Sequence, residues 1–209
     1  GDLAPLPELV ILAEKYDCTL IIDEAHATGT IGPGGKGLAA YYGLENKVPV
    51  IMGTLSKALG CFGAFIAGSG ELRKYLINFS RSFIYTTALP PGVLASALQA
   101  LTVLEEEPGL VEKLQNNAVY LRDGLKKLGC RVNEYPTPII PIIVGRAETA
   151  LKAAELLRQE GLMVTAIRPP TVPSSSSRVR LTVMATHTRN DLDFALGAFK
   201  KVVEKIDFM

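Results

Sequence analysis

Residues 18–29 read Cys-Thr-Leu-Ile-Ile-Asp-Glu-Ala-His-Ala-Thr-Gly, an apolar run that ends in two acidic residues and a histidine. Two more apolar runs follow, at residues 48–53 and 62–67. Because these runs are continuously apolar, we expect strands that are covered on both faces, as in a sheet flanked by helices. Helical periodicity over 5–16 and 71–81 places helices before and after the strands, which predicts an α/β fold.

The rest of the chain predicts a second set of helices and short strands. The expected elements are a strand at 82–85, a helical region at 91–128 with a break near residue 108, strands at 131–132, 139–144, 163–167 and 179–185, and helices at 147–160 and 189–206. Thr188 and Asp191 have the spacing of a capping pair at the start of the last helix. We expect the domain change within the long helical region, which gives domains 1–100 and 101–209.

The composition excludes several classes of protein. The chain has 209 residues, of which 48% are hydrophobic, so it can bury a substantial core and is neither a disordered segment nor a disulfide-stabilised miniprotein. With 22 basic and 21 acidic side chains, its net charge is +1, which gives no reason to expect nucleic acid as a partner. The three cysteines and two histidines are scattered, which predicts no metal site and favours a reducing compartment, the cytoplasm.

One uncharged stretch and the start of the chain bear on membrane and signal segments. Residues 82–104 carry no charge, but Pro90 and Pro91 interrupt them, so we expect a buried strand, turn and helix and no membrane span. The chain begins at Gly1 without a basic and apolar leader. We therefore expect no signal peptide, and a chain that starts within a longer protein.

Polar residues follow the first two predicted strands. Asp23, Glu24 and His26 come directly after the first strand, and Thr54 and Lys57 follow the second. Because open α/β sheets bind ligands beyond the carboxyl ends of their strands, we expect these side chains at one rim of the sheet. A buried acid requires a cationic partner, and a desolvated lysine is a usable amine nucleophile. The pattern therefore favours a ligand site at this rim.

Two other interpretations account for some of these residues. Asp-Glu-Ala-His at 23–26 also matches the Walker B motif of one helicase class. That motif requires a phosphate-binding loop, and the nearest candidate, residues 32–37, has the wrong spacing and no hydroxyl residue after its lysine. Alternatively, Asp23 is a solvated loop acid and Lys57 an ordinary surface lysine. Each residue alone favours this simpler interpretation, whereas their combination with the neighbouring glycines favours a site.

Five segments, in order along the chain, resemble the α-oxoamine synthase family of pyridoxal-phosphate enzymes: residues 23–29, 53–60, 81–91, 167–173 and 178–182. The resemblance covers essentially the whole chain. It implies the rear part of an aspartate aminotransferase-like large domain at 1–100 and a C-terminal α+β small domain at 101–209. It also implies that the chain is the C-terminal half of a family member. Residues 61–65 depart from the family pattern, which has Gly-Gly before an aromatic residue.

The resemblance links the first half of the chain to the cofactor, pyridoxal 5'-phosphate. It implies that Lys57 forms a Schiff base with the cofactor and moves the Cα proton of the substrate. It implies that Asp23 pairs with the pyridinium nitrogen and that His26 bonds the phenolic oxygen. Thr54 is implied to contact the phosphate or that same oxygen. Family dimers share their active sites, so Thr86 is implied to contact the phosphate of the partner subunit in a homodimer.

The resemblance links the second half of the chain to the substrates. Arg180 is implied to fix the carboxylate of the amino acid, and Arg168 and Thr171 to line the acyl end of the site. From strand alternation we expect Arg178 to point away from Arg180, and we assign it no role.

The family joins an amino acid to an acyl thioester with loss of carbon dioxide. Residues 167–173 most resemble the biotin-pathway branch, which implies L-alanine and a pimeloyl thioester as substrates. The alternative within the family is glycine with acetyl-coenzyme A. From other classes, the alternatives are a helicase-like ATPase fragment and an inactive, dimer-forming half.

Overall fold

The chain folds into two compact units. The computed structural model describes residues 1–206. Contacts divide the chain into an N-terminal unit, residues 4–111, and a C-terminal unit, which comprises residues 1–3 and the chain from residue 112 onward. The division falls within helix α6 (Gly109–Lys127), beyond the boundary at 100 and 101 that we expected from the sequence.

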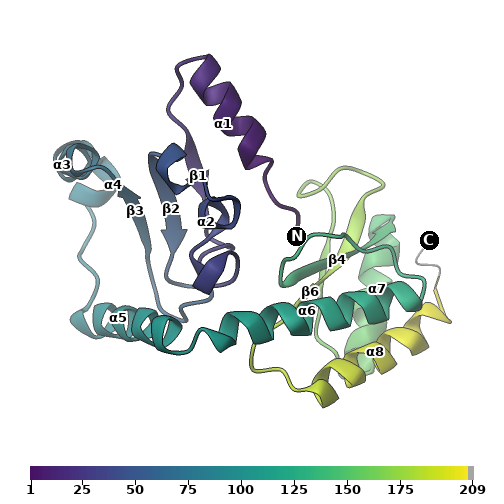
Figure 1. Ribbon diagram of the computed structural model, residues 1–209. Helices are drawn as coiled ribbons and strands as arrows, with labels where there is room; N and C mark the ends of the chain where they lie inside the picture. Colours follow the sequence, from purple (N-terminus) through teal and green to yellow (C-terminus); the bar gives the residue numbers. More distant parts are fainter. Residues whose placement is uncertain (207–209) are drawn as a thin grey trace. The chain divides into compact units, whose positions relative to one another are not determined.

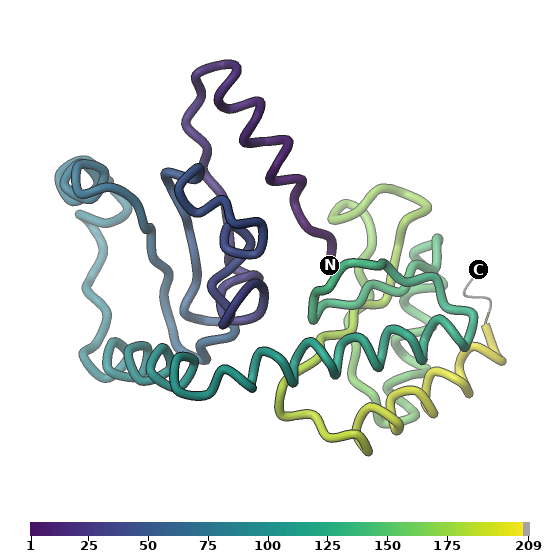
Figure 2. Tube along the Cα trace, viewed as in Figure 1, coloured from purple at the N-terminus to yellow at the C-terminus, as the bar shows by residue number. Residues whose placement is uncertain are grey.

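The N-terminal unit is built on a three-stranded sheet with the order β1-β2-β3. Strands β1 (Ile21–Asp23) and β2 (Val50–Thr54) are parallel, and β3 (Ala64–Gly68) runs antiparallel to β2. Helix α1 (Leu6–Lys15) precedes the sheet and α3 (Gly70–Phe79) follows it, as Figures 1 and 2 show. The prediction of an α/β fold is confirmed, and the carboxyl ends of β1 and β2 lie at the same edge of the sheet.

Short helical segments fill the connection between β1 and β2. Helix α2 (Leu38–Tyr42) lies there, flanked by 3-10 turns at Pro33–Gly35 and Glu45–Lys47, none of which the sequence predicted. The break in the long helical region is confirmed, since α5 (Pro91–Glu106) ends shortly before α6 begins. Among residues 1–206, no helix is both long and apolar enough to cross a membrane.

Helix α4 (Arg81–Ile84) stands where the sequence predicted a strand at 82–85, so that prediction is wrong. The carbonyl oxygen of Ser80 accepts hydrogen bonds from the N–H groups of Phe83 and Ile84, which closes this apolar run into a helical turn. Periodicity alone does not distinguish a strand from a helix in so short a run.

Strand β3 is not covered in the way that its apolar sequence predicts. Ile66 and Ala67 are exposed, and Phe65 is half-buried. The edge of β3 that faces away from β2 has no strand partner among the described residues. A cavity of about 550 Å³ lies against the strand, lined by Met52, Ala64, Phe65, Ile66, Arg73, Leu76, Ile77, Ser80 and Phe83. The expectation of a strand covered on both faces is therefore wrong for β3 within this chain.

The C-terminal unit contains an antiparallel sheet with the order β4-β6-β5. Strand β6 (Ser177–Thr182) lies between β4 (Ile139–Gly145) and β5 (Thr165–Ile167). Helices α7 (Ala147–Gln159) and α8 (Arg189–Val203) pack with α6 against one face of this sheet. The fully buried side chains of the C-terminal unit include Leu125, Ile140, Ile142, Leu157, Val179, Phe199 and Val202. The opposite face of the sheet carries the arginines described below.

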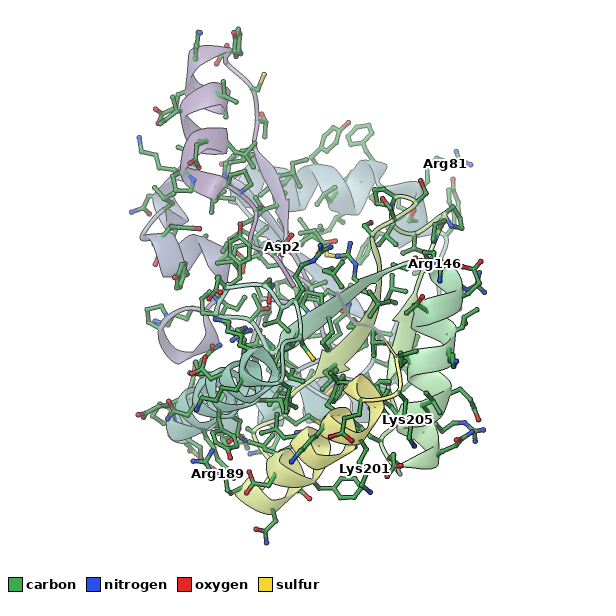
Figure 3. All side chains as sticks on the ribbon, turned by 90° about the vertical axis from the view of Figure 1, so that its right-hand side faces the viewer. Asp2, Arg81, Arg146, Arg189, Lys201 and Lys205 are labelled. Atoms are coloured by element: carbon green, nitrogen blue, oxygen red, sulfur yellow. The ribbon has the colours of Figure 1, made fainter. Side chains whose placement is uncertain are left out.

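Helix α8 begins at the capping box that the sequence predicted. The N–H of Thr188 donates to the Asp191 carboxylate (2.7 Å), and the N–H of Asp191 donates to the Thr188 hydroxyl (3.3 Å). The Thr188 hydroxyl also donates to the Asp191 carboxylate (2.7 Å), and this bond, together with the one from the Thr188 N–H, lowers the pKa of Asp191. Near the end of the helix, Lys201 and Lys205, labelled in Figure 3, approach the Glu160 carboxylate at N–O distances of 2.6 and 3.9 Å. Ion pairs of such exposed lysines add little stability, whereas the capping box satisfies backbone N–H groups at the start of α8.

Candidate active site

The candidate site lies at the edge of the N-terminal sheet where β1 and β2 end. Asp23 is the last residue of β1 and pairs in register with Met52, and Thr54 is the last residue of β2. Because the two strands are parallel, Asp23 and the loop after Thr54 leave the sheet at the same edge. His26 lies in the turn after β1, and Lys57 lies in the loop after β2. The structure therefore brings these four residues to one edge.

Hydrogen bonds close the loop that carries Lys57. The hydroxyl of Thr54 donates to the carbonyl oxygen of Gly63 (3.0 Å) and accepts from the N–H of Ser56 (3.2 Å). Within the loop, the N–H of Gly60 donates to the carbonyl oxygen of Lys57 (3.0 Å). Thr54 is buried, whereas Lys57 is exposed. Thr54 thus holds the base of the loop, and its single hydroxyl hydrogen is engaged by Gly63.

A tight turn presents Asp23 and His26. The N–H of Glu24 donates to the carbonyl oxygen of Met52 (2.8 Å), which continues the pairing of β1 with β2 beyond Asp23. The N–H of Ala25 donates to Oδ1 of Asp23 (2.8 Å) and fixes the carboxylate. Both Asp23 and His26 are exposed at this turn, where a ligand can reach them.

The side chain of Glu24 is buried and ties the turn to helix α2. Only 2% of Glu24 is exposed, and its Oε1 accepts a hydrogen bond from the N–H of Ala39 (2.9 Å). Burial raises the pKa of Glu24 above its ordinary value of 4.5, although hydrogen bonds from the backbone of Ala39 and Leu38 oppose this effect. A Cβ on Gly37 would collide with Oε2 of Glu24. Sequence reasoning missed this contact, because a backbone N–H leaves no signal in the pattern of side chains.

The glycine-rich loop after His26 packs against the loop that carries Lys57. Gly29 has a φ of +79°, and a Cβ at this position would lie 2.8 Å from the Cβ of Ala58. The N–H of Gly29 also donates to the carbonyl oxygen of Gly35 (2.7 Å). A side chain at position 29 would push the two loops apart. Glycine therefore allows the loops that carry the imidazole and the amine to lie in contact.

Thr86 lies on the exposed segment between α4 and α5. The same segment reaches the Lys57 loop through Leu89, whose Cδ1 lies 2.8 Å from the position of a Cβ on Gly63. The structure thus places the segment beside the loop, while the Thr86 side chain itself is exposed.

Glu24→Gln tests the buried carboxylate through its pH dependence. Because burial raises the pKa of Glu24 in the folded chain, the stability that its protonated form contributes is lost as the pH rises through that pKa. Glutamine keeps an acceptor oxygen and does not titrate. We expect the stability of the native chain, relative to the variant, to be highest below pH 4.5 and to decline above it. Urea unfolding across this range measures the difference; Glu8→Gln, an exposed acid on α1, is the control. A relative stability that increases with pH would contradict the assignment.

The C-terminal unit carries the residues that the resemblance links to the substrates. Arg180 is exposed on β6, opposite Pro141 of β4 and Thr165 of β5. Arg168 is exposed just after β5, and its carbonyl oxygen accepts a hydrogen bond from the N–H of Thr171 (3.1 Å). Arg168 and Thr171 thus share one turn at the end of β5.

The expectation that Arg178 points away from Arg180 is wrong. Residues two apart in a strand lie on the same face of the sheet. The burial along β6 follows this rule, since Ser177, Val179 and Leu181 are buried while Arg178, Arg180 and Thr182 are partly or fully exposed. Arg178 therefore lies beside Arg180 on the open face of the sheet.

The residues at the edge of the N-terminal sheet match the chemical needs of pyridoxal phosphate. The cofactor attaches through an amine, and Lys57 is an exposed amine that forms no ion pair within residues 1–206. A carboxylate keeps the ring nitrogen of the cofactor protonated, and Asp23 is exposed with one oxygen oriented by the N–H of Ala25. His26 supplies an imidazole at the same edge. This donor set fits the cofactor, which Lys57, Asp23 and His26 would hold.

Comparison with known proteins identifies relatives of the chain. The family described as aminotransferase class I and II matches residues 1–199. The chain is 48% identical over 205 residues to a putative 8-amino-7-oxononanoate synthase from Desulforudis audaxviator, which covers 98% of this chain and 53% of that protein. It is 45% identical over 202 residues to the 8-amino-7-oxononanoate synthase of Lysinibacillus sphaericus. The matched residues are 97% of this chain and 52% of that protein. The chain thus spans about half the length of these curated relatives.

Solved structures show the same fold. Serine palmitoyltransferase from S. paucimobilis, with a bound pyridoxal phosphate–myriocin aldimine, has a TM-score of 0.94 and 31% identity over 100% of this chain and 53% of its own. An 8-amino-7-oxononanoate synthase from Francisella tularensis has a TM-score of 0.84 and 28% identity, over 98% of this chain and 60% of that chain. These matches exclude the helicase-like ATPase alternative. The chain belongs to the aminotransferase class I and II family of pyridoxal-phosphate enzymes, among its α-oxoamine synthases.

Proposed function

We propose that the protein containing this chain is an acyltransferase that joins L-alanine to a pimeloyl thioester, of coenzyme A or a carrier protein. The thiol of coenzyme A or the carrier protein is released, carbon dioxide is lost, and the product is 8-amino-7-oxononanoate, used in biotin synthesis. The observation that carries the proposal is the position of Lys57, Asp23 and His26 at one sheet edge. Relatives that are 48% and 45% identical, both named for this synthase, support the choice of reaction.

Lys57 is the residue on which the reaction depends. Its amine would attach the cofactor and, once the amine of alanine has displaced it, would be free to move the proton at Cα of alanine. Pyridoxal phosphate, when bound, supplies an electron sink for the negative charge that develops at Cα. The Asp23 carboxylate pairs with the ring nitrogen through a charge-assisted hydrogen bond, which stabilises the charged ring by about 1.5–3 kcal/mol. The His26 imidazole bonds the phenolic oxygen and orients the ring.

Buried residues keep these groups in position. Glu24 fixes the turn that carries Asp23 and His26, and Thr54 fixes the base of the Lys57 loop. A direct contact between Thr54 and the phosphate or the phenolic oxygen would require its hydroxyl to turn away from Gly63. Reactive groups held in one arrangement lower the entropic part of the barrier.

The arginines of the C-terminal unit bind the substrates in this proposal. Arg180 binds the carboxylate of alanine, because a guanidinium group offers two parallel hydrogen bonds to a carboxylate and so orients it. Arg168 and Thr171 line the acyl end of the site. The enzyme acts in the cytoplasm as a homodimer with shared active sites, in which Thr86 contacts the phosphate bound by the partner subunit.

Loss of the Lys57 amine tests the proposal. We expect the full-length protein, incubated with pyridoxal phosphate and then reduced with borohydride, to carry the mass of the cofactor on the peptide that contains Lys57. Lys57→Ala should lose this adduct. Lys74→Ala, which removes an exposed lysine of α3, should keep it. An equal adduct in Lys57→Ala would overturn the assignment.

The choice of amino acid needs a separate measurement. Alanine and glycine are titrated into the cofactor-loaded protein, and binding is followed through the visible absorbance of the cofactor. We expect alanine to bind more tightly. A preference for glycine would instead identify a glycine C-acetyltransferase.

A further inference from the structure

The open face of the C-terminal sheet carries two neighbouring arginines that have no acidic partner among residues 1–206. Arg178 and Arg180 share this face of β6. The Nε of Arg178 donates to the carbonyl oxygen of Ser176 (3.0 Å), which orients the guanidinium group and leaves its terminal nitrogens available. Neither arginine forms an ion pair in the part of the chain that the structure describes. Two such cations repel each other, so an anion bound between them would relieve the repulsion.

The strands on either side offer apolar surface to Arg178. Ile143 of β4 and Ile167 of β5 stand directly opposite Arg178, whereas Arg180 stands opposite a proline and a threonine. Residues directly opposite in antiparallel strands project on the same face, where their side chains interact. A cation flanked by two isoleucines suits an anionic group at the end of a hydrocarbon chain, because the methylene groups can pack on the isoleucines while the anion meets the cation.

We propose that Arg178 binds the far carboxylate of a dicarboxylic acyl chain, while Arg180 binds the carboxylate of the amino acid. This inference rests on the proposed function, since a pimeloyl thioester carries a chain of this kind. Two residues of extended strand span about 6.6 Å. Both arginine side chains are long and flexible, so the two carboxylates of free pimelate, a seven-carbon diacid, can reach both of them. Arg178 is then the residue that distinguishes a dicarboxylic from a monocarboxylic chain.

Two acids of equal chain length test this with the full-length protein that contains this chain: pimelate, which has two carboxylates, and heptanoate, which has one. Binding is followed by NMR through the Nε–Hε signals of the arginines. We expect the native chain to bind pimelate about tenfold more tightly than heptanoate, which is the effect of one charge-assisted hydrogen bond. In Arg178→Gln the preference should disappear while the affinity for heptanoate stays unchanged. Arg178→Lys, which keeps the charge, should retain part of the preference.

Lys152→Gln is the matched control. It removes one positive charge from the exposed side of α7, which packs on the opposite face of the sheet, and it should leave the preference intact. Equal affinity of the native chain for the two acids, or an unchanged preference in Arg178→Gln, would overturn the inference. Lys57 lies in the other unit, so the two proposals can fail separately. If the cofactor adduct forms at Lys57 but pimelate is not preferred, only the role of Arg178 is contradicted. If pimelate is preferred but no cofactor adduct forms at Lys57, the proposed reaction is contradicted.

Discussion

Gly37→Ala is expected to lower the free energy of unfolding of the N-terminal unit by about 3 kcal/mol or more. Gly37 has a φ of +103°, a conformation that alanine rarely adopts, and its new Cβ would collide with the Glu24 carboxylate. The backbone strain accounts for about 1–2 kcal/mol. Displacement of Glu24 adds the loss of its hydrogen bond from the N–H of Ala39 and leaves a buried acid without this partner. Urea unfolding, followed by circular dichroism, measures the loss.

Gly43→Ala separates the two causes. Gly43 also has a positive φ, +66°, but a Cβ there would meet no described atom within 4 Å. This variant should therefore lose only about 1–2 kcal/mol, the part due to the backbone. Because Glu24 fixes the turn that carries His26, Gly37→Ala should also weaken the binding of pyridoxal phosphate, whereas Gly43→Ala should not. Equal losses in the two variants would show that the collision with Glu24 is unimportant.

Phe199→Ala is expected to destabilise the C-terminal unit by about 3–5 kcal/mol. Phe199 lies on α8, is fully buried, and belongs to the cluster that joins the helices to the sheet. Truncation removes the transfer free energy of the ring and leaves a cavity that the surrounding helices and strands fill only in part. Hydrogen exchange of the β6 amides measures the loss within this unit.

Phe194→Ala on the same helix is the control. Phe194 is 54% exposed, so its ring contributes little to the core, and the variant should change the stability by less than about 1 kcal/mol. If the two substitutions destabilised the unit equally, Phe199 would not be the anchor of α8 that its burial indicates.

The sequence predicted the main elements because their signals are local. The apolar run before Asp23 gave β1, the spacing of Thr188 and Asp191 gave the start of α8, and the break near Pro108 separated α5 from α6. The signal failed at α4, where a four-residue apolar run fits a helical turn as well as a strand. The apolar run of β3 also predicted a strand covered on both faces, which this chain does not provide. Apolar residues indicate that a strand is buried, but they do not indicate which part of the protein covers it.

The candidate site was predictable to the extent that its chemistry lies in side chains near strand ends. Asp23, His26 and Lys57 were found in this way. Glu24 was missed, because its partner is a backbone N–H fifteen residues away, at the start of a helix that the sequence did not reveal. The expectation for Arg178 fails because strand alternation places adjacent residues on opposite faces and residues two apart on the same face.

The unpaired edge of β3 governs how the chain behaves in a concentrated sample. A strand edge with free N–H and C=O groups pairs readily with the same edge of another molecule, and exposed apolar side chains such as Ile66 strengthen that pairing. The curated relatives are about twice as long as this chain. Produced alone, the chain is therefore prone to aggregate through β3, and co-production with the remainder of the protein is the sound route to a monodisperse preparation.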